Sequence, residues 1–556
     1  MPVDVPTEGG LSLLDDAVVG VYLVAMLGMG FYIARRQRST DDFFLGGRRL
    51  PAWAVGISLF ASLLSTITYL GMPGEMFRTG VAFLTRQIPV PIVLLVVWFV
   101  LIPFFMRLKL TSAYEYLERR FNYATRAMAA VFCLLLLFGW MSVVVLTAAG
   151  AMVEIANLNV TWFFGTNDLS GPFRDADMHV MILSIGLFSV LYTAMGGMRA
   201  VVWTDVIQFL VLMIGALFTM GAIAWSTHSG VAEWLATSRS YRHETVEWFN
   251  SNVGDRSNVT FIAIGMMFWF VCTHGANQVA LQRYFSVGDI RAARRTYLVS
   301  AIASLGIGII LAGVGIALMH FIQRFDLPAS SELASTVASV RQKAPDKIFP
   351  QFIRYYLPDG LRGMVVAALF AAAMSTIDSG ANSVTTIVTI DFFRRFRRGP
   401  ASASSELTLA RCLTATMGLV IVASTWGLYH LSKGTDIITL CQKGFNCFLG
   451  PLGGLFTLAM FSRRATARTV LPALLIGEVT GVCASYSQEL FGIPFSTHLV
   501  IATSWLVTIA TGWVLAVLFD TCASDEQQRW MWLPIVRSKD LPRTTDARWR
   551  AAESDL

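Results

Sequence analysis

The chain has 556 residues, of which 55% are hydrophobic and only 14% are charged, and its mean hydropathy is +0.59. A soluble protein carries charge on about a quarter of its residues, so this composition indicates a polytopic membrane protein, with the lipid bilayer as a partner. The formal net charge of +7 does not indicate nucleic-acid binding, because the basic residues lie in short loops beside apolar spans. The seven cysteines have no metal-ligand spacing, and we interpret them as small packing residues.

The apolar segments predict an all-α fold with about 13 transmembrane spans. In chain order they are residues 14–34, 53–79, 81–106, 124–155, 178–198, 200–225, 259–282, 296–320, 361–392, 407–430, 436–461, 469–490 and 497–519. Loops rich in arginine and lysine follow the first, third, seventh and ninth spans, all on one side of the membrane. By the positive-inside rule that side is cytoplasmic, which predicts a multi-pass protein of the plasma (inner) membrane with its N-terminus outside and its C-terminus in the cytoplasm.

Two of the spans are interrupted. The second carries serines and threonines at its middle, then Gly71, Pro73 and Gly74, and the seventh is interrupted at residues 272–278. Interrupted helices at matching positions of two halves indicate an inverted-repeat transporter with its substrate between the breaks, although plain glycine kinks are an alternative. We therefore divide the chain into residues 1–34 (N-terminus and first span), 51–226 and 258–461 (two five-span repeats), 468–520 (two additional spans) and 521–556 (cytoplasmic tail).

The ninth span has one hydroxyl-rich face. Its polar residues and Ala372 fall within less than half of the helix surface, and they are Ser375, Thr376, Asp378, Ser379, Asn382, Ser383 and Thr386. Such a face can serve as a contact between helices. A carboxylate at membrane depth, however, usually lines an ion or substrate path, and hydroxyl and carbonyl oxygens are ligands that Na⁺ accepts. The pattern therefore predicts an ion site in a transporter.

Several motifs resemble the sodium:solute symporter family, whose members have the LeuT-type inverted-repeat fold, and the similarity extends from about residue 16 to residue 519. The motifs are residues 42–48 (DFFLGGR), 111–121 (TSAYEYLERRF), 196–208 (GGMRAVVWTDVIQ) and 282–284 (QRY). The segment 70–75 (LGMPGE), continuing into 111–121, is most similar to the branch that carries iodide, monocarboxylates and vitamins. The resemblance implies Na⁺ as coupling ion and no other cofactor.

The resemblance also implies a sodium site. Its ligands would be the carbonyls of Ala61, Leu64 and Ala372 and the hydroxyls of Ser375 and Thr376, in agreement with the polar face of the ninth span. Further residues are candidates for a second cation site or for supplying charge nearby, and they are Asp205, Asp378 and Ser379. Asp205 has an alternative interpretation as a cap at the start of the sixth span. Asp378 stands where relatives can have a neutral residue.

The substrate contacts implied by the resemblance are Ser65, Thr68 and Gln87, with Arg86 and His274 as further candidates. Arg86 can alternatively extend outward to water, and His274 can be a structural histidine. Sialic-acid relatives have a carboxylate-binding arginine in the fourth span, where this chain reads FGWM at 138–141, which counts against sialic acid.

These features predict a sodium-coupled symporter that imports a small organic solute, most simply an anion, by alternating access. A sodium-coupled sugar or polyol symporter is the alternative, because hydroxyl groups both donate and accept hydrogen bonds. An ion channel, a membrane sensor and an enzyme are disfavoured, because the sequence has no filter-like repeat, no output domain and no acid–base or metal constellation.

Overall fold

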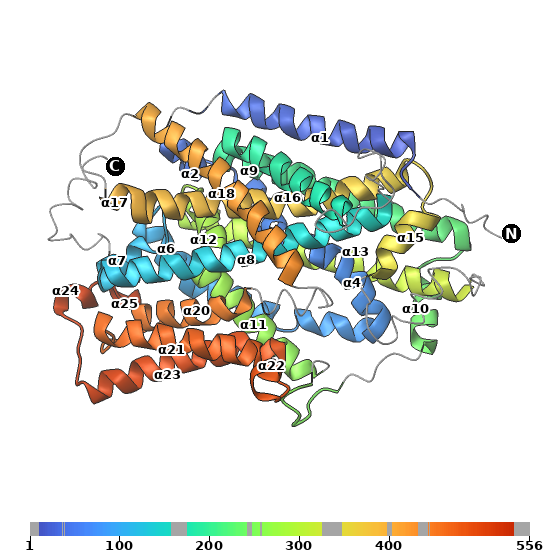
Figure 1. The fold of residues 1–556 in the computed structure, drawn as a ribbon. Coiled ribbons are helices and arrows are strands. Elements are labelled where there is room, and N and C mark those ends of the chain that lie inside the picture. The colour runs from blue at the N-terminus through green and yellow to red at the C-terminus, as the bar shows by residue number, and fades with distance from the viewer. Residues whose placement is uncertain are drawn as a thin grey trace.

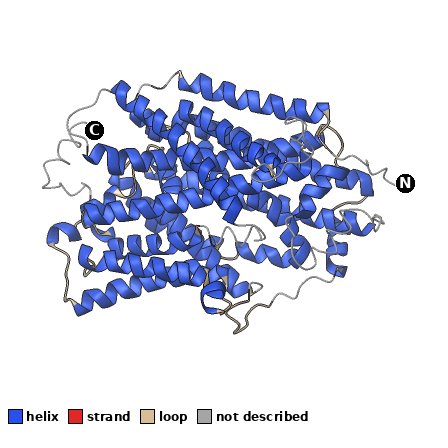
Figure 2. Cartoon of the chain, viewed as in Figure 1, coloured by secondary structure: helices blue, strands red, loops and turns tan. Residues whose placement is uncertain are grey.

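The computed structural model describes residues 10–35, 37, 39–156, 175–241, 247–255, 258–324, 347–396, 403–431, 443 and 445–538, and every regular element within them is a helix (Figure 2). The first part of the chain forms α1 (Leu13–Ala34), α2 (Thr40–Leu45), η1 (Gly46–Arg48), α3 (Ala52–Leu63), α4 (Thr66–Thr79), η2 (Gly80–Gln87), α5 (Val90–Val96), η3 (Val97–Leu101), α6 (Ile102–Leu108), α7 (Glu115–Arg120), α8 (Tyr123–Ala156), α9 (Ala176–Thr227) and α10 (Val231–Ser240).

The remainder forms α11 (Val259–Ala276), α12 (Gln278–Phe285), α13 (Ile290–Arg324), α15 (Ile348–Tyr356), α16 (Leu361–Ile387), η7 (Val388–Phe393), α17 (Arg394–Phe396), α18 (Ala403–Leu431), α20 (Asn446–Phe461), α21 (Ala467–Ser485), α22 (Ser487–Phe491), η8 (Thr497–Leu499), α23 (Val500–Leu518), α24 (Asp525–Gln528) and α25 (Trp532–Arg537).

The spans agree with the sequence prediction once two special cases are counted. Among the described residues ten helices are long and apolar enough to cross a membrane, and the bent pair α3 and α4 makes an eleventh span. Helix α9 has 52 residues and contains a non-helical Gly197 (φ 50°, ψ −160°), so it comprises the predicted fifth and sixth spans. Helix α20, with 16 residues, is the described part of the predicted span 436–461, most of whose first ten residues lie outside the described part of the chain.

Both predicted interruptions are confirmed, and each is a short extended segment between two helices. The second span breaks at Leu64 and Ser65, where α3 and α4 meet at an angle of 67°. The seventh breaks at Asn277 (φ −87°, ψ 124°), between α11 and α12. Neither break is a glycine kink. The predicted breakers at residues 71–74 lie inside α4, which accommodates Pro73 without a further interruption.

Helix α16 is the centre of the molecule. Its membrane-spanning window is 89% buried, compared with 22% for α1, and it packs against α1, α3, α8, α9 and α18. In Figure 1, α1 lies along one edge of the bundle and α20, α21 and α23 lie together along the opposite edge. Because α16 touches so many other elements, its polar face meets protein on every side.

The motif at 111–121 connects the two halves at one end of the bundle. The backbone N–H of Ala113 donates to Gln278 Oε1 (2.9 Å), and Gln278 Nε2 donates to the Thr111 carbonyl (2.9 Å). Arg126 at the start of α8 forms ion pairs with Asp391 (2.7 Å) and Glu118 (2.8 Å). Asp391 lies in η7, which directly follows α16. This end of the bundle is therefore closed by buried ion pairs.

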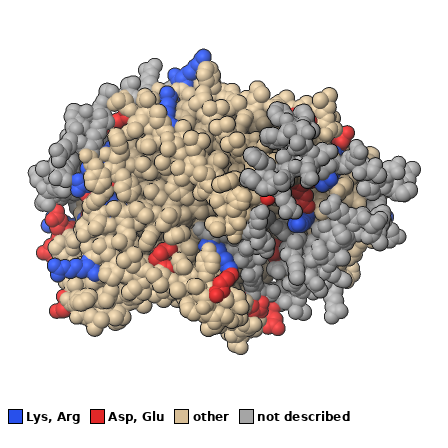
Figure 3. All heavy atoms as spheres, viewed as in Figure 1, with Lys and Arg blue, Asp and Glu red and all other residues tan. Residues whose placement is uncertain are grey.

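The outer surface is apolar where a bilayer would contact it. Figure 3 shows a broad area at the centre of the view with few charged side chains, while charges gather toward the end that carries the C-terminus. Exposed apolar residues such as Ile302, Leu305 and Ile309 on α13 belong to this type of surface. Large exposed apolar surfaces are unfavourable in water, so the chain is an integral membrane protein.

Candidate functional site

The break in the second span leaves backbone carbonyls without helical partners. At Leu64 (φ −82°, ψ 114°) and Ser65 (φ −108°, ψ 168°) the chain is extended. Carbonyls in the last turn of α3 therefore lack the N–H donors that a continuing helix would supply. The Leu64 N–H still donates to the Phe60 carbonyl (2.8 Å). The carbonyls of Ala61 and Leu64 follow Phe60 in the chain and can accept a hydrogen bond or bind a cation.

Helix α16 places two hydroxyls against these carbonyls. The Ser375 hydroxyl donates to the carbonyls of Ala61 (3.0 Å) and Ala372 (3.1 Å). The Thr376 hydroxyl lies 3.4 Å from the Leu64 carbonyl and 3.3 Å from the Ala372 carbonyl. All five residues are buried, so the structure brings the whole predicted set of sodium ligands into one oxygen-lined position. Hard oxygen ligands that replace water are what a small cation requires.

Asp205 lies next to this position, in a second polar cluster. It is within α9, and its carboxylate accepts hydrogen bonds from Ser58 (2.5 Å) and Ser62 (3.5 Å) of α3. Ser62 and Ser379 are hydrogen bonded to each other (2.7 Å), which joins α3 to α16. Asp205 lies well inside the helical segment that follows Gly197, and its carboxylate faces α3, so the alternative that it caps the start of a helix is not supported.

Arg283 is a site residue that sequence reasoning assigned only to a motif. This fully buried side chain of α12 lies 3.6 Å from Asp205, donates to Ser62 (2.6 Å) and also donates to Ser379. The guanidinium therefore balances the Asp205 carboxylate at the centre of the bundle. An intramembrane charge needs a counter-charge, so the acid at 205 was the signal that a basic partner exists elsewhere in the chain.

Asp378 has different partners from Ser379 and faces the first half of α9. Its carboxylate accepts hydrogen bonds from Tyr192 and from Thr193 (2.9 Å), and Gln208 donates to the Tyr192 hydroxyl (3.3 Å). Tyr22 of α1 contacts Met374 Sδ (3.8 Å) in the same region. The three candidates for a second cation site thus belong to two clusters, one around Asp205 and Ser379 and one around Asp378.

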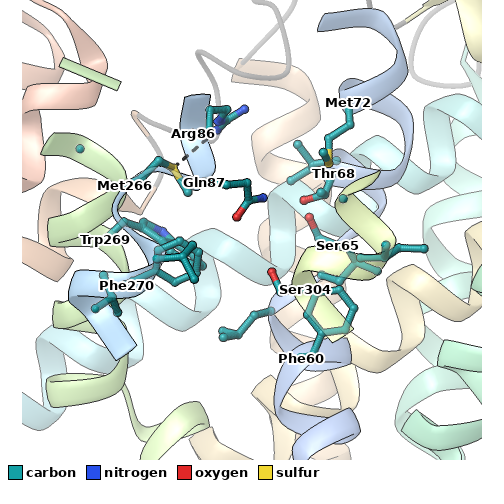
Figure 4. A pocket seen from close by; sticks show the side chains of 18 of the residues that line it. Phe60, Ser65, Thr68, Met72, Arg86, Gln87, Met266, Trp269, Phe270 and Ser304 are labelled. Carbon is teal, nitrogen blue, oxygen red and sulfur yellow. Dashed lines mark hydrogen bonds between the residues drawn. The ribbon is translucent and has the colours of Figure 1, made fainter. Parts of the chain in front are cut away.

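The predicted substrate residues all line one cavity, of about 300 Å³, beside the break. Figure 4 shows Gln87 reaching from η2 toward Ser65 and Thr68, with Trp269 and Phe270 on its own side of the space and Phe60 and Ser304 across it. The set of predicted residues lining it is Ser65, Thr68, Arg86, Gln87 and His274. Leu64 also lines the cavity, so the cavity adjoins the oxygen-lined position.

His274 both lines the cavity and has internal partners. Its Nδ1 and the Tyr284 hydroxyl are 2.8 Å apart, and its ring lies edge-on to Tyr297 with centroids 4.9 Å apart. Only 2% of the residue is exposed. These contacts fix the ring from two sides, as expected for a structural histidine, and leave it at the cavity wall.

Several residues of the cavity were not predicted. Trp140 lines it from α8, within the segment that the sequence analysis noted for lacking an arginine. Asn446 comes from α20, and Thr497, His498 and Ile501 come from the additional spans outside the two predicted repeats. No motif marks the residues at 497–501, because their position depends on how η8 and α23 pack against α11.

The sequence profile of the sodium:solute symporter family matches residues 43–477. The sodium/sialic acid symporter SiaT of Proteus mirabilis is 31% identical over 500 residues, covering 88% of this chain and 94% of that protein. The sodium/sialic acid symporter NanT of Aliivibrio fischeri is 30% identical over 519 residues, covering 92% and 95%. The sodium-dependent multivitamin transporter of Oryctolagus cuniculus, from the branch that the motifs favoured, is 29% identical over 481 residues, covering 84% and 69%.

Solved structures agree with the family assignment. A substrate-bound, outward-open Na⁺-coupled sialic acid symporter superposes with a TM-score of 0.78 at 28% identity, covering 92% of this chain and 99% of the other. The nucleobase-cation-symport transporter MHP1, at 13% identity, has a TM-score of 0.50 over 88% of this chain and 97% of its own, which shows the shared fold alone. The fold is therefore the LeuT-type inverted-repeat fold, and the chain is a member of the sodium:solute symporter family.

Proposed function

We propose that this protein is a Na⁺-coupled symporter that imports a small organic anion, with the coupling ion bound by Ala61, Leu64, Ala372, Ser375 and Thr376. The observation that carries the proposal is the convergence of these five oxygens, with the hydroxyls of α16 within 3.0–3.4 Å of the carbonyls of α3 and of Ala372. An ion bridging the broken span and α16 stabilises the arrangement in which the cavity is complete. Solute binding then completes closure, and rocking of one repeat against the other releases both into the cytoplasm.

The substrate assignment rests on charge. Arg86 lines the cavity, and hydroxyl and amide donors from Ser65, Thr68 and Gln87 line it too. Ser65 immediately precedes α4, and helix N-termini favour negative charge. The relatives named for sialic acid carry an anion, which agrees with the proposal. Two observations favour the sugar alternative. The cavity has a hydroxyl lining, and a sodium/glucose cotransporter of Vibrio parahaemolyticus is 28% identical to this chain.

The orientation belongs to the proposal as well. The N-terminal end of α1 would lie outside and the charged segment after residue 520 in the cytoplasm, as the positive loops predict. The end closed by Arg126 and Asp391 is then the cytoplasmic end. A transporter with its inner end closed by ion pairs and a cavity beside its broken helices is arranged to receive ion and solute from outside.

Equilibrium Na⁺ binding tests the ion site without knowledge of the solute. In purified protein, Na⁺ should raise the melting temperature in wild type more than K⁺ does, because an ion that binds only the folded state stabilises it. Ser375→Ala and Thr376→Ala should lose this effect while still folding. A Na⁺-specific stabilisation that is equal in wild type and both variants would remove the site assignment.

A further inference from the structure

A groove of about 570 Å³ lies on the outer surface of the bundle, separate from the cavity beside the broken helices. Helices α1 and α18 both pack against α9, and residues from all three line the groove. Gly30 of α1 lies against Tyr192 of α9, and Gly418 of α18 lies against Val190, so closely that a side chain at either glycine would clash. This close packing fixes the position of both walls on α9.

The walls of the groove are apolar and face outward. Phe31 of α1, Leu187 and Leu191 of α9 and Leu419 of α18 line it, and between 47% and 55% of each of these residues is exposed. Along α9 the lining extends from Leu187 to Met195, which is about 12 Å at 1.5 Å per residue. An apolar groove that opens toward the bilayer is a surface for an acyl chain.

Two arginines lie at one end of this groove. Arg35 directly follows α1, and Arg411 lies about two turns into α18. Arg411 Nη2 donates to the Ala34 carbonyl (3.4 Å), which places its guanidinium at the same end of α1 as Arg35. Figure 3 shows basic side chains at the upper edge of the molecule, where Figure 1 places this end of α1.

Neither guanidinium has a strong acceptor. The Arg35 Cζ lies 4.2 Å from the centre of the Phe31 ring, and the Arg411 Nε is buried without a hydrogen-bond partner. Glu406, one to two turns before Arg411 in α18, is already paired with Arg394 (2.7 Å). The ion pairs within the described part of the chain include neither Arg35 nor Arg411. A buried donor without an acceptor is costly, so the pair favours an anionic ligand.

The arrangement matches the two parts of one phospholipid. A guanidinium has a planar fork of N–H donors that fits phosphate oxygens. Basic pockets between transmembrane helices on the cytoplasmic side bind anionic lipid headgroups. A single arginine at a helix end can extend to the headgroups of any lipid. Here a second arginine comes from another helix, and an apolar groove begins beside both.

We propose that the groove between α1 and α18 binds an anionic phospholipid, with Arg35 and Arg411 at its phosphate and an acyl chain along α9. In the orientation proposed above, the arginines lie in the cytoplasmic leaflet, where anionic lipids are found. The bound lipid connects α1 to α18, whose spanning windows are each only 22% buried. The site lies on the lipid-facing surface, so the proposal does not depend on which solute is carried.

The test measures lipid binding to the purified, delipidated full-length protein in detergent. Native mass spectrometry gives the affinity, and the melting temperature gives the stabilisation. The probes are dioleoyl phosphatidylglycerol, dioleoyl phosphatidylcholine with the same chains, and inorganic phosphate. Phosphatidylglycerol should bind most tightly and raise the melting temperature most, because it alone combines a net negative headgroup with an acyl chain. A phosphatidylglycerol with a photoreactive acyl chain should crosslink to α9 and α18 at the groove.

Four variants assign the roles of charge and groove. Arg35→Gln and Arg411→Gln should each weaken phosphatidylglycerol binding about fivefold, and the double variant about twentyfold or more. Ala415→Phe fills the groove with both charges in place, and it should weaken binding and reduce the crosslink to α9. Arg294→Gln is the matched control, because Arg294 is also half-buried, donates to a backbone carbonyl (Trp98, 3.2 Å) and does not line the groove. It should bind phosphatidylglycerol as wild type does.

Equal binding of the two phospholipids, or equal stabilisation by inorganic phosphate, would overturn the proposal. An equal loss in Arg411→Gln and Arg294→Gln would also overturn it, because the effect would then follow net charge alone. Unchanged affinity in Ala415→Phe would show that no acyl chain occupies the groove. If a variant does not fold, the crosslink in wild type decides, and labelling confined to helices other than α1, α9 and α18 contradicts the site.

Discussion

Removal of the Thr376 hydroxyl tests how the coupling ion is bound. The side chain is fully buried, and its hydroxyl lies 3.4 Å from the Leu64 carbonyl and 3.3 Å from the Ala372 carbonyl. In Thr376→Ala an ion at this position loses one of five oxygen ligands, and water has little room to replace it. A polar interaction with a charged group is worth about 1.5–3 kcal/mol. Since 1.4 kcal/mol is a factor of ten, Na⁺ affinity should fall by about ten- to a hundredfold.

The assay is the Na⁺ concentration for half-maximal stabilisation or uptake, with two comparison variants. Thr376→Ser keeps the hydroxyl and should bind Na⁺ nearly as wild type does. Thr385→Ala removes another fully buried hydroxyl from the same helix, one that donates only within α16 to the Ala381 carbonyl (2.8 Å). It should leave Na⁺ affinity unchanged. Equal Na⁺ affinities in Thr376→Ala and Thr385→Ala would refute the reasoning.

The other predictions address charge, burial and orientation. Asp205→Asn should impair transport about as much as Asp205→Ala, because either change leaves Arg283 buried without its counter-charge. For the same reason both should lower the free energy of unfolding by about 3–5 kcal/mol. Wild-type Na⁺ affinity in the asparagine variant would contradict this. Tyr192→Phe should lower the free energy of unfolding by about 1–3 kcal/mol, because the Asp378 carboxylate loses one of its two hydrogen-bond donors. The measurement is denaturation in detergent, and an unchanged stability would show that the bond contributes nothing. In a cysteine-free background, a cysteine at Thr40 should be labelled only from the cytoplasmic side and one at Asn252 only from outside, and the reverse pattern would invert the proposed orientation.

The broken spans were predictable from the sequence because they depend on local chemistry, whereas the sodium ligands stay a prediction. The shared face of the hydroxyls at 375 and 376 follows from helical periodicity, whereas the carbonyls at 61 and 64 were implied only by the family resemblance. The exact position of the break was less visible. It falls at Leu64 and Ser65, about two turns before Gly71 and Pro73. A proline within a helix can be tolerated where neighbouring helices and side chains satisfy the freed backbone groups.

The partners of the buried charges were not predictable. Asp205 and Arg283 are 78 residues apart in the sequence (283 minus 205), and only the packing of α3, α9, α12 and α16 brings them within 3.6 Å. Likewise Asp378 and Ser379 are neighbours in the chain and face different clusters, because successive residues of a helix point about 100° apart. The cavity residues after position 496 lie outside the repeats, so the repeat pattern carried no information about them.

Uptake into proteoliposomes is the most direct test of sodium-coupled anion import. The protein is challenged with monocarboxylates, pantothenate, iodide, hexoses, inositol and amino acids under an inward Na⁺ gradient and an inside-negative potential, which supplies about 2.3 kcal/mol per net charge per 100 mV. We expect that an anion accumulates only with the Na⁺ gradient and that Thr376→Ala needs about ten- to a hundredfold more Na⁺ for the same uptake. Accumulation that is unchanged when K⁺ replaces Na⁺ would contradict the coupling, and competition by hexoses or inositol with none by any anion would contradict the anionic substrate.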